Sequence, residues 1–107
     1  MVVSLEELEK KLVIARELLR RDVGKALSLM KEVASEAIKM AAPGWDPRYE
    51  CLAEYSSLRK MPDFFREMAD RIEWSWRFAM EAKELDALMA LSSAAFLVEV
   101  VRRLRRT

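Results

Sequence analysis

Glycine and proline, the residues that most often interrupt helices, are scarce in this chain. Its 107 residues include two glycines and three prolines, which provide too few chain reversals for an all-β fold. Most of the other residues are Ala, Leu, Glu, Arg, Lys or Met, which favour helix. The sequence therefore predicts an all-α protein.

Two long helices are predicted before the Pro43–Gly44 pair. Apolar residues recur at spacings of three and four from residue 5 to 19 and again from 23 to 41, which is the pattern of amphipathic helices. Ser4 and Asp22 stand directly before these stretches and are suitable N-caps. We therefore expect a helical hairpin that ends at Pro43–Gly44.

The second half of the chain predicts a short helix followed by a long one. Asp46 and the proline after it predict a helix from about residue 47 to 60, and Met61–Pro62 interrupts it. The next helix continues toward residue 85, with a break or bend near 83–86, and whether it forms one helix or two stays open. We therefore predict an antiparallel up-and-down bundle of four to five helices in a single domain, residues 1–107.

Charge and composition limit the partners of this chain. The 19 basic and 18 acidic residues nearly balance, so only a local patch could attract nucleic acid or an anionic membrane. The single cysteine, Cys51, cannot form an internal disulfide, and acidic residues stand where a signal peptide would be apolar. We expect a cytoplasmic protein, and the absence of Asn and Gln beside abundant Glu and Arg indicates a thermophilic source.

The absence of histidine removes most enzyme mechanisms. Without histidine there is no ordinary general base near neutral pH and no Ser-His or Cys-His nucleophile. We therefore predict no catalytic residue, no metal ligand and no cofactor. The weaker alternative is a divalent-metal-dependent nucleotide phosphohydrolase of the all-α type, because Glu67 and Asp70 match the Glu-x-x-Asp half of its metal site.

The C-terminal segment is apolar on almost every side. From residue 87 to 101 only Ser92, Ser93 and Glu99 are polar, and the run is shorter than the roughly 20 apolar residues of a membrane-spanning helix. A helix that is apolar all round is normally buried. We therefore expect no membrane contact and a homodimer, whose interface is predicted to contain Leu91, Ala94, Ala95, Leu97, Val98 and Val101.

Four arginines follow this apolar run. Cations offset the dipole at the carboxyl end of a helix, which accounts for one or two of Arg102, Arg103, Arg105 and Arg106. The remaining arginines predict a contact with nucleic acid or a protein partner. We include Trp74 among the residues of this predicted contact. Trp74 lies two residues from Trp76, so one indole must face outward, and Arg71 and Arg77 could form a nucleotide clamp with it.

Parts of the sequence resemble HEPN domains. The stretch from Ala15 to Ala26 followed by Glu32 to Ala41 resembles the first helical hairpin of that family, and the Ala-rich stretch from Leu85 to Leu104 is similar to its last helix. The resemblance implies a helical bundle that dimerises, in a family with many ribonucleases and toxins, often paired with a small nucleotidyltransferase. Their nuclease motif pairs Arg with His, so the resemblance here implies a catalytically silent member.

These observations favour a non-enzymatic, homodimeric helical bundle that acts as a protein interaction or assembly module. The second function class is nucleic-acid binding through the C-terminal arginines. The third is the metal-dependent phosphohydrolase.

Overall fold

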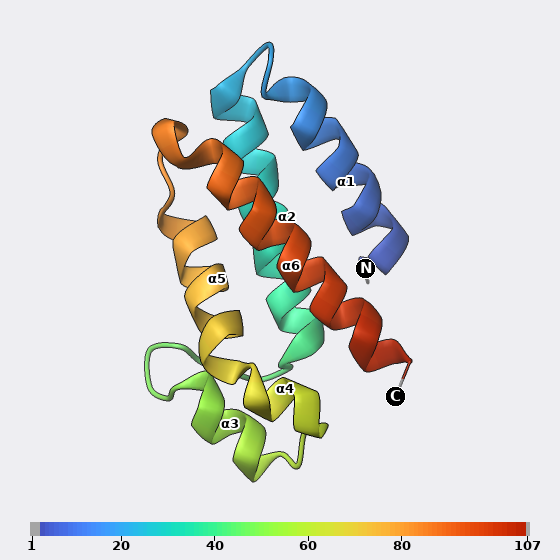
Figure 1. The fold of residues 1–107 in the computed structure, drawn as a ribbon, viewed down its shortest axis with the longest axis vertical. Coiled ribbons are helices and arrows are strands. Elements are labelled where there is room, and N and C mark those ends of the chain that lie inside the picture. Colours follow the sequence, from blue (N-terminus) through green and yellow to red (C-terminus); the bar gives the residue numbers. More distant parts are fainter. Residues whose placement is uncertain (1–2, 107) are drawn as a thin grey trace.

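The computed structural model describes residues 3–106, which form helices joined by short turns (Figure 1). No strand occurs among these residues, which confirms the all-α prediction. The elements are α1 (Leu5–Leu18), α2 (Val23–Ala41), α3 (Leu52–Leu58), α4 (Asp63–Glu67), α5 (Ala69–Glu81), the 3₁₀ turn η1 (Glu84–Asp86) and α6 (Ala87–Arg105).

The four long helices form an antiparallel up-and-down bundle. In Figure 1, α1 and α5 run in one direction and lie on opposite sides of α2 and α6, which run in the other. The most extensive packing is between α2 and α6. The short helices α3 and α4 connect α2 to α5 and lie together at one end of the bundle. The helical-bundle prediction is therefore confirmed.

Local sequence signals account for the first hairpin. The Ser4 hydroxyl accepts a hydrogen bond from the backbone N–H of Glu7 at 3.2 Å, and the Asp22 carboxylate accepts one from the N–H of Lys25 at 3.1 Å. Both predicted N-caps are thus confirmed. After α2, Gly44 adopts a φ of 86°, a left-handed conformation that glycine adopts without strain.

The third helix begins later than predicted. Asp46 does not cap a helix at Pro47, because its carboxylate accepts hydrogen bonds from the backbone N–H of Arg48 at 3.0 Å and from the guanidinium of the same residue. These bonds lower the pKa of Asp46 below its ordinary 3.8. Only a turn forms here, and α3 begins at Leu52.

A carboxylate from another helix caps α3. The backbone N–H of Leu52 donates to Oε1 of Glu73, in α5, at 2.7 Å. Glu73 also pairs with Arg77, whose guanidinium donates to the carbonyl of Pro47 at 3.2 Å. Side chains of α5 therefore hold both ends of the segment that leads into α3.

The predicted long helix after Pro62 is divided in two places. The first division, at Met68, separates α4 from α5 without glycine or proline, which makes the prediction of an uninterrupted helix wrong there. It turns α4 across the end of α6, where the guanidinium of Arg103 lies 4.2 Å from the ring centroid of Phe64. The second division lies at η1 and confirms the predicted break near 83–86.

Candidate functional site

Most residues of the predicted dimer interface are buried within the bundle of a single chain. Ala94, Leu97, Val98 and Val101 are buried, and α6 packs against α1, α2 and α5. The structure therefore corrects their assignment to an interface between subunits, because the flanking helices already cover them. Of the other two predicted residues, Leu91 is half-buried and Ala95 is exposed. The homodimer itself stays a prediction.

Large apolar side chains are exposed instead at the start of α6 and just before it. Leu85 is 100% exposed, Leu88 74% and Met89 54%. Farther along α6, Ser92 and Ala95 are also exposed. Because these residues follow helical spacing, they form one outward stripe along the first half of the helix.

The neighbouring helix α5 also has an exposed aromatic side chain. The two helices run antiparallel and pack together, and the guanidinium of Arg71 lies 4.9 Å from the ring centroid of Phe96. With about 3.6 residues per turn, this contact leads us to expect Phe78 near Met89, two turns farther along each helix. Phe78 stacks on Trp74, with centroids 5.2 Å apart, and Trp74 is 57% exposed.

We call the surface formed by these neighbouring residues the outer apolar face. It consists of Trp74, Phe78, Leu85, Leu88, Met89, Ser92 and Ala95. A cleft of about 320 Å³ adjoins it, where Leu85 and Leu88 meet Leu19 and Val23 at the turn between α1 and α2.

The C-terminal arginines are partly used within the chain. Arg102 forms ion pairs with Glu9 in α1, at 2.7 Å, and with Glu99. Arg103 lies over Phe64 and donates to the sulfur of Met68 at 3.8 Å. Arg105 and Arg106 are exposed and have no side-chain partner in the described part of the chain. The nucleic-acid alternative therefore has two free guanidinium groups instead of the predicted four.

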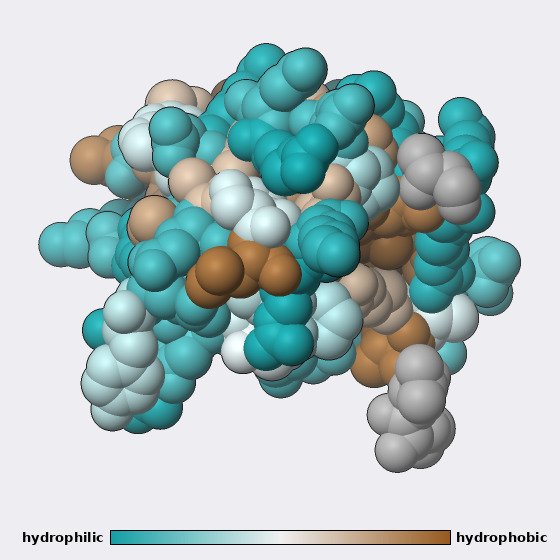
Figure 2. All heavy atoms as spheres, turned by 90° about the horizontal axis from the view of Figure 1, so that it is seen from below, coloured by the Kyte–Doolittle hydropathy of each residue, from teal (hydrophilic) through white to brown (hydrophobic). Residues whose placement is uncertain are grey.

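The end of the bundle near these arginines is mainly hydrophilic. Figure 2 looks onto the end where α3 and α4 lie, and most of the surface seen there is hydrophilic, with hydrophobic residues in a small central area and in a strip at one side. Leu58 of α3 is exposed to 70%, so a single large apolar residue on this surface is not unusual.

The predicted nucleotide clamp around Trp74 is not formed. Trp74 faces outward as predicted, but Arg71 stacks over Phe96. Arg77 pairs with Glu73 at 2.9 Å and bonds to Pro47. Both arginines are therefore held by contacts within the chain.

The carboxylates that suggested a metal site do not gather into one. Glu67 ends α4 and Asp70 lies in the first turn of α5, so the division at Met68 interrupts the expected continuous helix. Among residues 3–106, no three Asp, Glu or Cys side chains lie close enough together to hold a metal ion.

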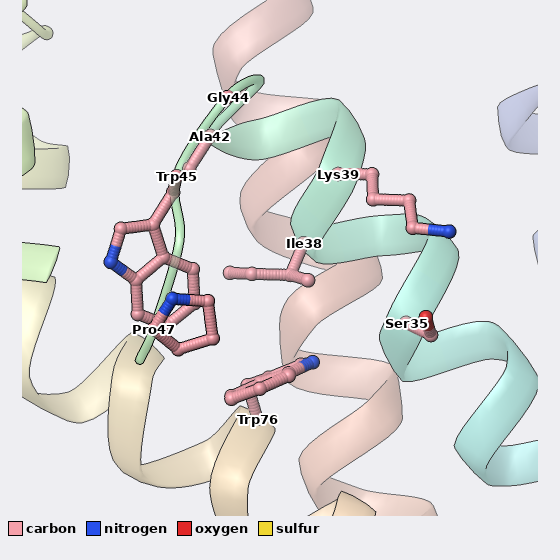
Figure 3. A pocket seen from close by; sticks show the side chains of 8 residues that line it. All are labelled: Ser35, Ile38, Lys39, Ala42, Gly44, Trp45, Pro47 and Trp76. Carbon is pink, nitrogen blue, oxygen red and sulfur yellow. The ribbon is translucent and has the colours of Figure 1, made fainter. Parts of the chain in front are cut away.

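A cleft that was not predicted lies between α2, α5 and the loop that joins α2 to α3 (Figure 3). Its volume is about 150 Å³. The indoles of Trp45 and Trp76 meet edge to face there, with centroids 5.3 Å apart. The residues lining it are Ser35, Ile38, Lys39, Ala42, Gly44, Trp45, Pro47 and Trp76. In the sequence, the aromatic residues were the only sign of this cleft. Their contact could not be predicted, because Trp45 reaches Trp76 only through the conformation of the loop.

Two hydrogen bonds stabilise this loop. Within the loop, Nε1 of Trp45 donates to the carbonyl of Glu50 at 3.2 Å. The hydroxyl of Tyr55, in α3, donates to the loop carbonyl of Pro43 at 2.5 Å. Burial raises the pKa of Tyr55 above its ordinary 10.0, although the nearby charge of Arg59 opposes the shift. The loop therefore has a defined conformation on which the cleft depends.

Comparisons with protein-family models, curated proteins and solved structures gave no match to this chain. None of the helices within residues 3–106 combines the length and the apolar character that crossing a membrane requires.

Proposed function

We propose that this chain is a non-enzymatic interaction module that self-associates through the outer apolar face. The observation that carries the proposal is the exposure of Leu85, Leu88 and Met89, together with that of Trp74 on α5, the helix that packs against α6. Single exposed apolar residues are common on protein surfaces, but adjoining large ones mark interaction sites. Trp is also among the residues enriched where binding energy concentrates.

A second copy of the chain is the partner that this surface fits best. The side chains of the stripe are large at one end, at Leu85 and Leu88, and small at the other end, at Ser92 and Ala95. If two copies pack their α6 helices antiparallel across a twofold axis, the large end of each meets the small end of the other. The net charge of +1 produces little repulsion between the copies.

The sequence resemblance to HEPN domains supports the same proposal, because it implies a bundle that dimerises without the nuclease motif. We further propose that the module acts in the cytoplasm, for which the single cysteine is the support, and that its source is thermophilic, for which the charge composition and the lack of Asn and Gln are the support.

The experiment compares Leu88→Glu with Leu58→Glu by sedimentation velocity. The two leucines have similar exposure, 74% and 70%, and they lie at opposite ends of the bundle. We expect the wild type and Leu58→Glu to sediment as two 12.5 kDa chains. Leu88→Glu should sediment as one chain, because a carboxylate buried in the interface lacks a partner.

Circular dichroism accompanies the sedimentation and should show the same helix content for all three proteins. A wild type that stays a single chain at high micromolar concentration would overturn the proposal. So would dissociation of both variants to the same extent, since that would place the contact elsewhere.

A further inference from the structure

Most arginines of this chain have a partner within it. Those that pair with a carboxylate or lie over an aromatic ring are Arg48, Arg59, Arg66, Arg71, Arg77, Arg102 and Arg103. In the described part of the chain, the arginines without such a contact are Arg16, Arg20, Arg21, Arg105 and Arg106. The free guanidinium groups therefore fall into two clusters, one after α1 and one at the end of α6.

The cluster after α1 surrounds a hollow in the surface. Arg16 lies in the last turn of α1, and Arg20 and Arg21 lie in the turn that leads to α2. Together with Glu17 they line a space of about 360 Å³. It lies at the end of the bundle opposite α3 and α4 (Figure 1).

The lining of this hollow is positively charged. Glu17 is the one carboxylate in it, and among residues 3–106 it forms no ion pair with any of the three arginines. The nearby carboxylate of Asp22 accepts the backbone N–H of Lys25, whose own ammonium is exposed. The carboxyl end of α1 favours a cation, which accounts for one guanidinium group. The others repel one another, and an anion in the hollow would remove this repulsion.

The geometry of the guanidinium group narrows the kind of anion. Each group is a planar fork of N–H donors that matches two oxygens of a carboxylate or a phosphate. Three such forks offer more donors than the two oxygens of a carboxylate can use. The phosphate of a monoester has three free oxygens and nearly two negative charges at neutral pH, so it fits the cluster better.

We propose that this hollow binds the phosphate group of a small phosphate monoester. Arg16 donates to the phosphate oxygens from α1, and Arg20 and Arg21 donate from the turn that follows. The lining shares no residue with the outer apolar face, so binding does not require self-association. The site adds a small-molecule ligand to the proposed interaction module.

Two matched probes test this recognition. Methyl phosphate is a monoester, whereas dimethyl phosphate is a diester with fewer free oxygens and a single negative charge. Each is titrated at constant ionic strength and about pH 7.5, where the monoester is mostly doubly charged. The readout is the backbone N–H signals of Arg20 and Arg21 in a two-dimensional NMR spectrum. The signals of Arg105 and Arg106, which also lack a partner among the described residues, are the internal control.

We expect methyl phosphate to shift the Arg20 and Arg21 signals saturably, with a Kd on the order of 1 mM. Dimethyl phosphate should bind roughly tenfold more weakly, because it offers less charge and fewer acceptors to the guanidinium groups. The Arg105 and Arg106 signals should not shift saturably with either probe.

Two multiple variants locate the site. Combining Arg16→Gln, Arg20→Gln and Arg21→Gln should abolish saturable binding of methyl phosphate. Combining Arg105→Gln and Arg106→Gln should leave the affinity unchanged. All five side chains are exposed, and circular dichroism should show the same helix content for both variants and the wild type.

The proposal is overturned if methyl phosphate produces no saturable shift at Arg20 and Arg21. It is also overturned if the two probes bind equally well, since that result would point to the phosphodiester backbone of a nucleic acid instead. Equal loss of affinity in the two multiple variants would overturn it too. Should the triple variant fail to fold, the comparison of the two probes on the unaltered chain still decides the question.

Discussion

The outward surfaces of the two halves of α6 differ in chemical character. In the first half, Leu88 and Met89 project from the bundle and Ser92 beside them is exposed. In the second half, Arg102 pairs with Glu9 and Glu99, and Arg103 packs on α4. Two of the arginines are thus held by contacts within the chain, whereas the large apolar side chains are left exposed.

This difference reverses the simplest interpretation of the sequence. The apolar run suggested residues that needed covering, and the arginines suggested charge left over for a partner. In the structure the inward apolar residues are covered by the bundle, and two of the arginines are engaged. The surface available to a partner is therefore the outer apolar face more than the basic end.

The largest expected effect is a difference in stability loss between truncation of a buried leucine and truncation of an exposed leucine on α6. Leu97→Ala should lower the free energy of unfolding by about 2–5 kcal/mol, because it removes fully buried side-chain volume. Leu88→Ala should change it by less than about 0.5 kcal/mol. Urea denaturation at low protein concentration measures both. Similar losses for the two variants would contradict the assignment of inner and outer faces.

A second pair of residues extends the comparison of buried and exposed positions to the loop after α2. Tyr55 is buried and bonded to Pro43, whereas Tyr49 is 81% exposed. Tyr55→Phe should lower the free energy of unfolding by about 1 kcal/mol, the contribution of one hydrogen bond. Tyr49→Phe should have almost no effect.

The contribution of Tyr55 should also depend on pH. Its pKa is raised above 10.0 in the folded chain, so the stabilisation is complete below pH 10 and is lost as the pH rises through the folded pKa. The difference in stability between wild type and Tyr55→Phe should therefore shrink in alkaline solution. A difference that grows above pH 10 would contradict the direction of the shift.

The smallest expected effect concerns the arginines. Arg102→Ala should cost about 0.5–1 kcal/mol, since partly exposed ion pairs contribute little, and Arg105→Ala should cost nothing measurable. High salt should reduce the difference, because it screens the pairs of Arg102 with Glu9 and Glu99. Equal melting temperatures for the two variants at low salt would show that Arg102 is as free as Arg105.

The sequence was most informative where the signals are local. Ser4, Asp22 and Gly44 act within a few residues of their own positions, so the first hairpin could be predicted almost to the residue. The division at Met68 and the late start of α3 depend on contacts with other elements, and no local pattern announces them. The start of α3, for example, is set by Glu73, which is distant in the chain.

The candidate sites were harder to predict for a different reason. Because α6 is apolar on nearly every side, its periodicity does not distinguish the inward from the outward face. The sequence could identify the helix as unusual, but not which residues are exposed. The outward position of Trp74 was predictable, because its separation from Trp76 forces the two indoles apart.

The bond between Glu73 and the backbone of Leu52 has a consequence for the order of folding. A helix of seven residues is far too short to persist alone, and the N-cap residue of α3, Cys51, contributes no side-chain hydrogen bond. The α1–α2 hairpin carries its own caps and can form early. We therefore expect α3 to form only once α5 is in place, and to be lost when α5 unfolds locally.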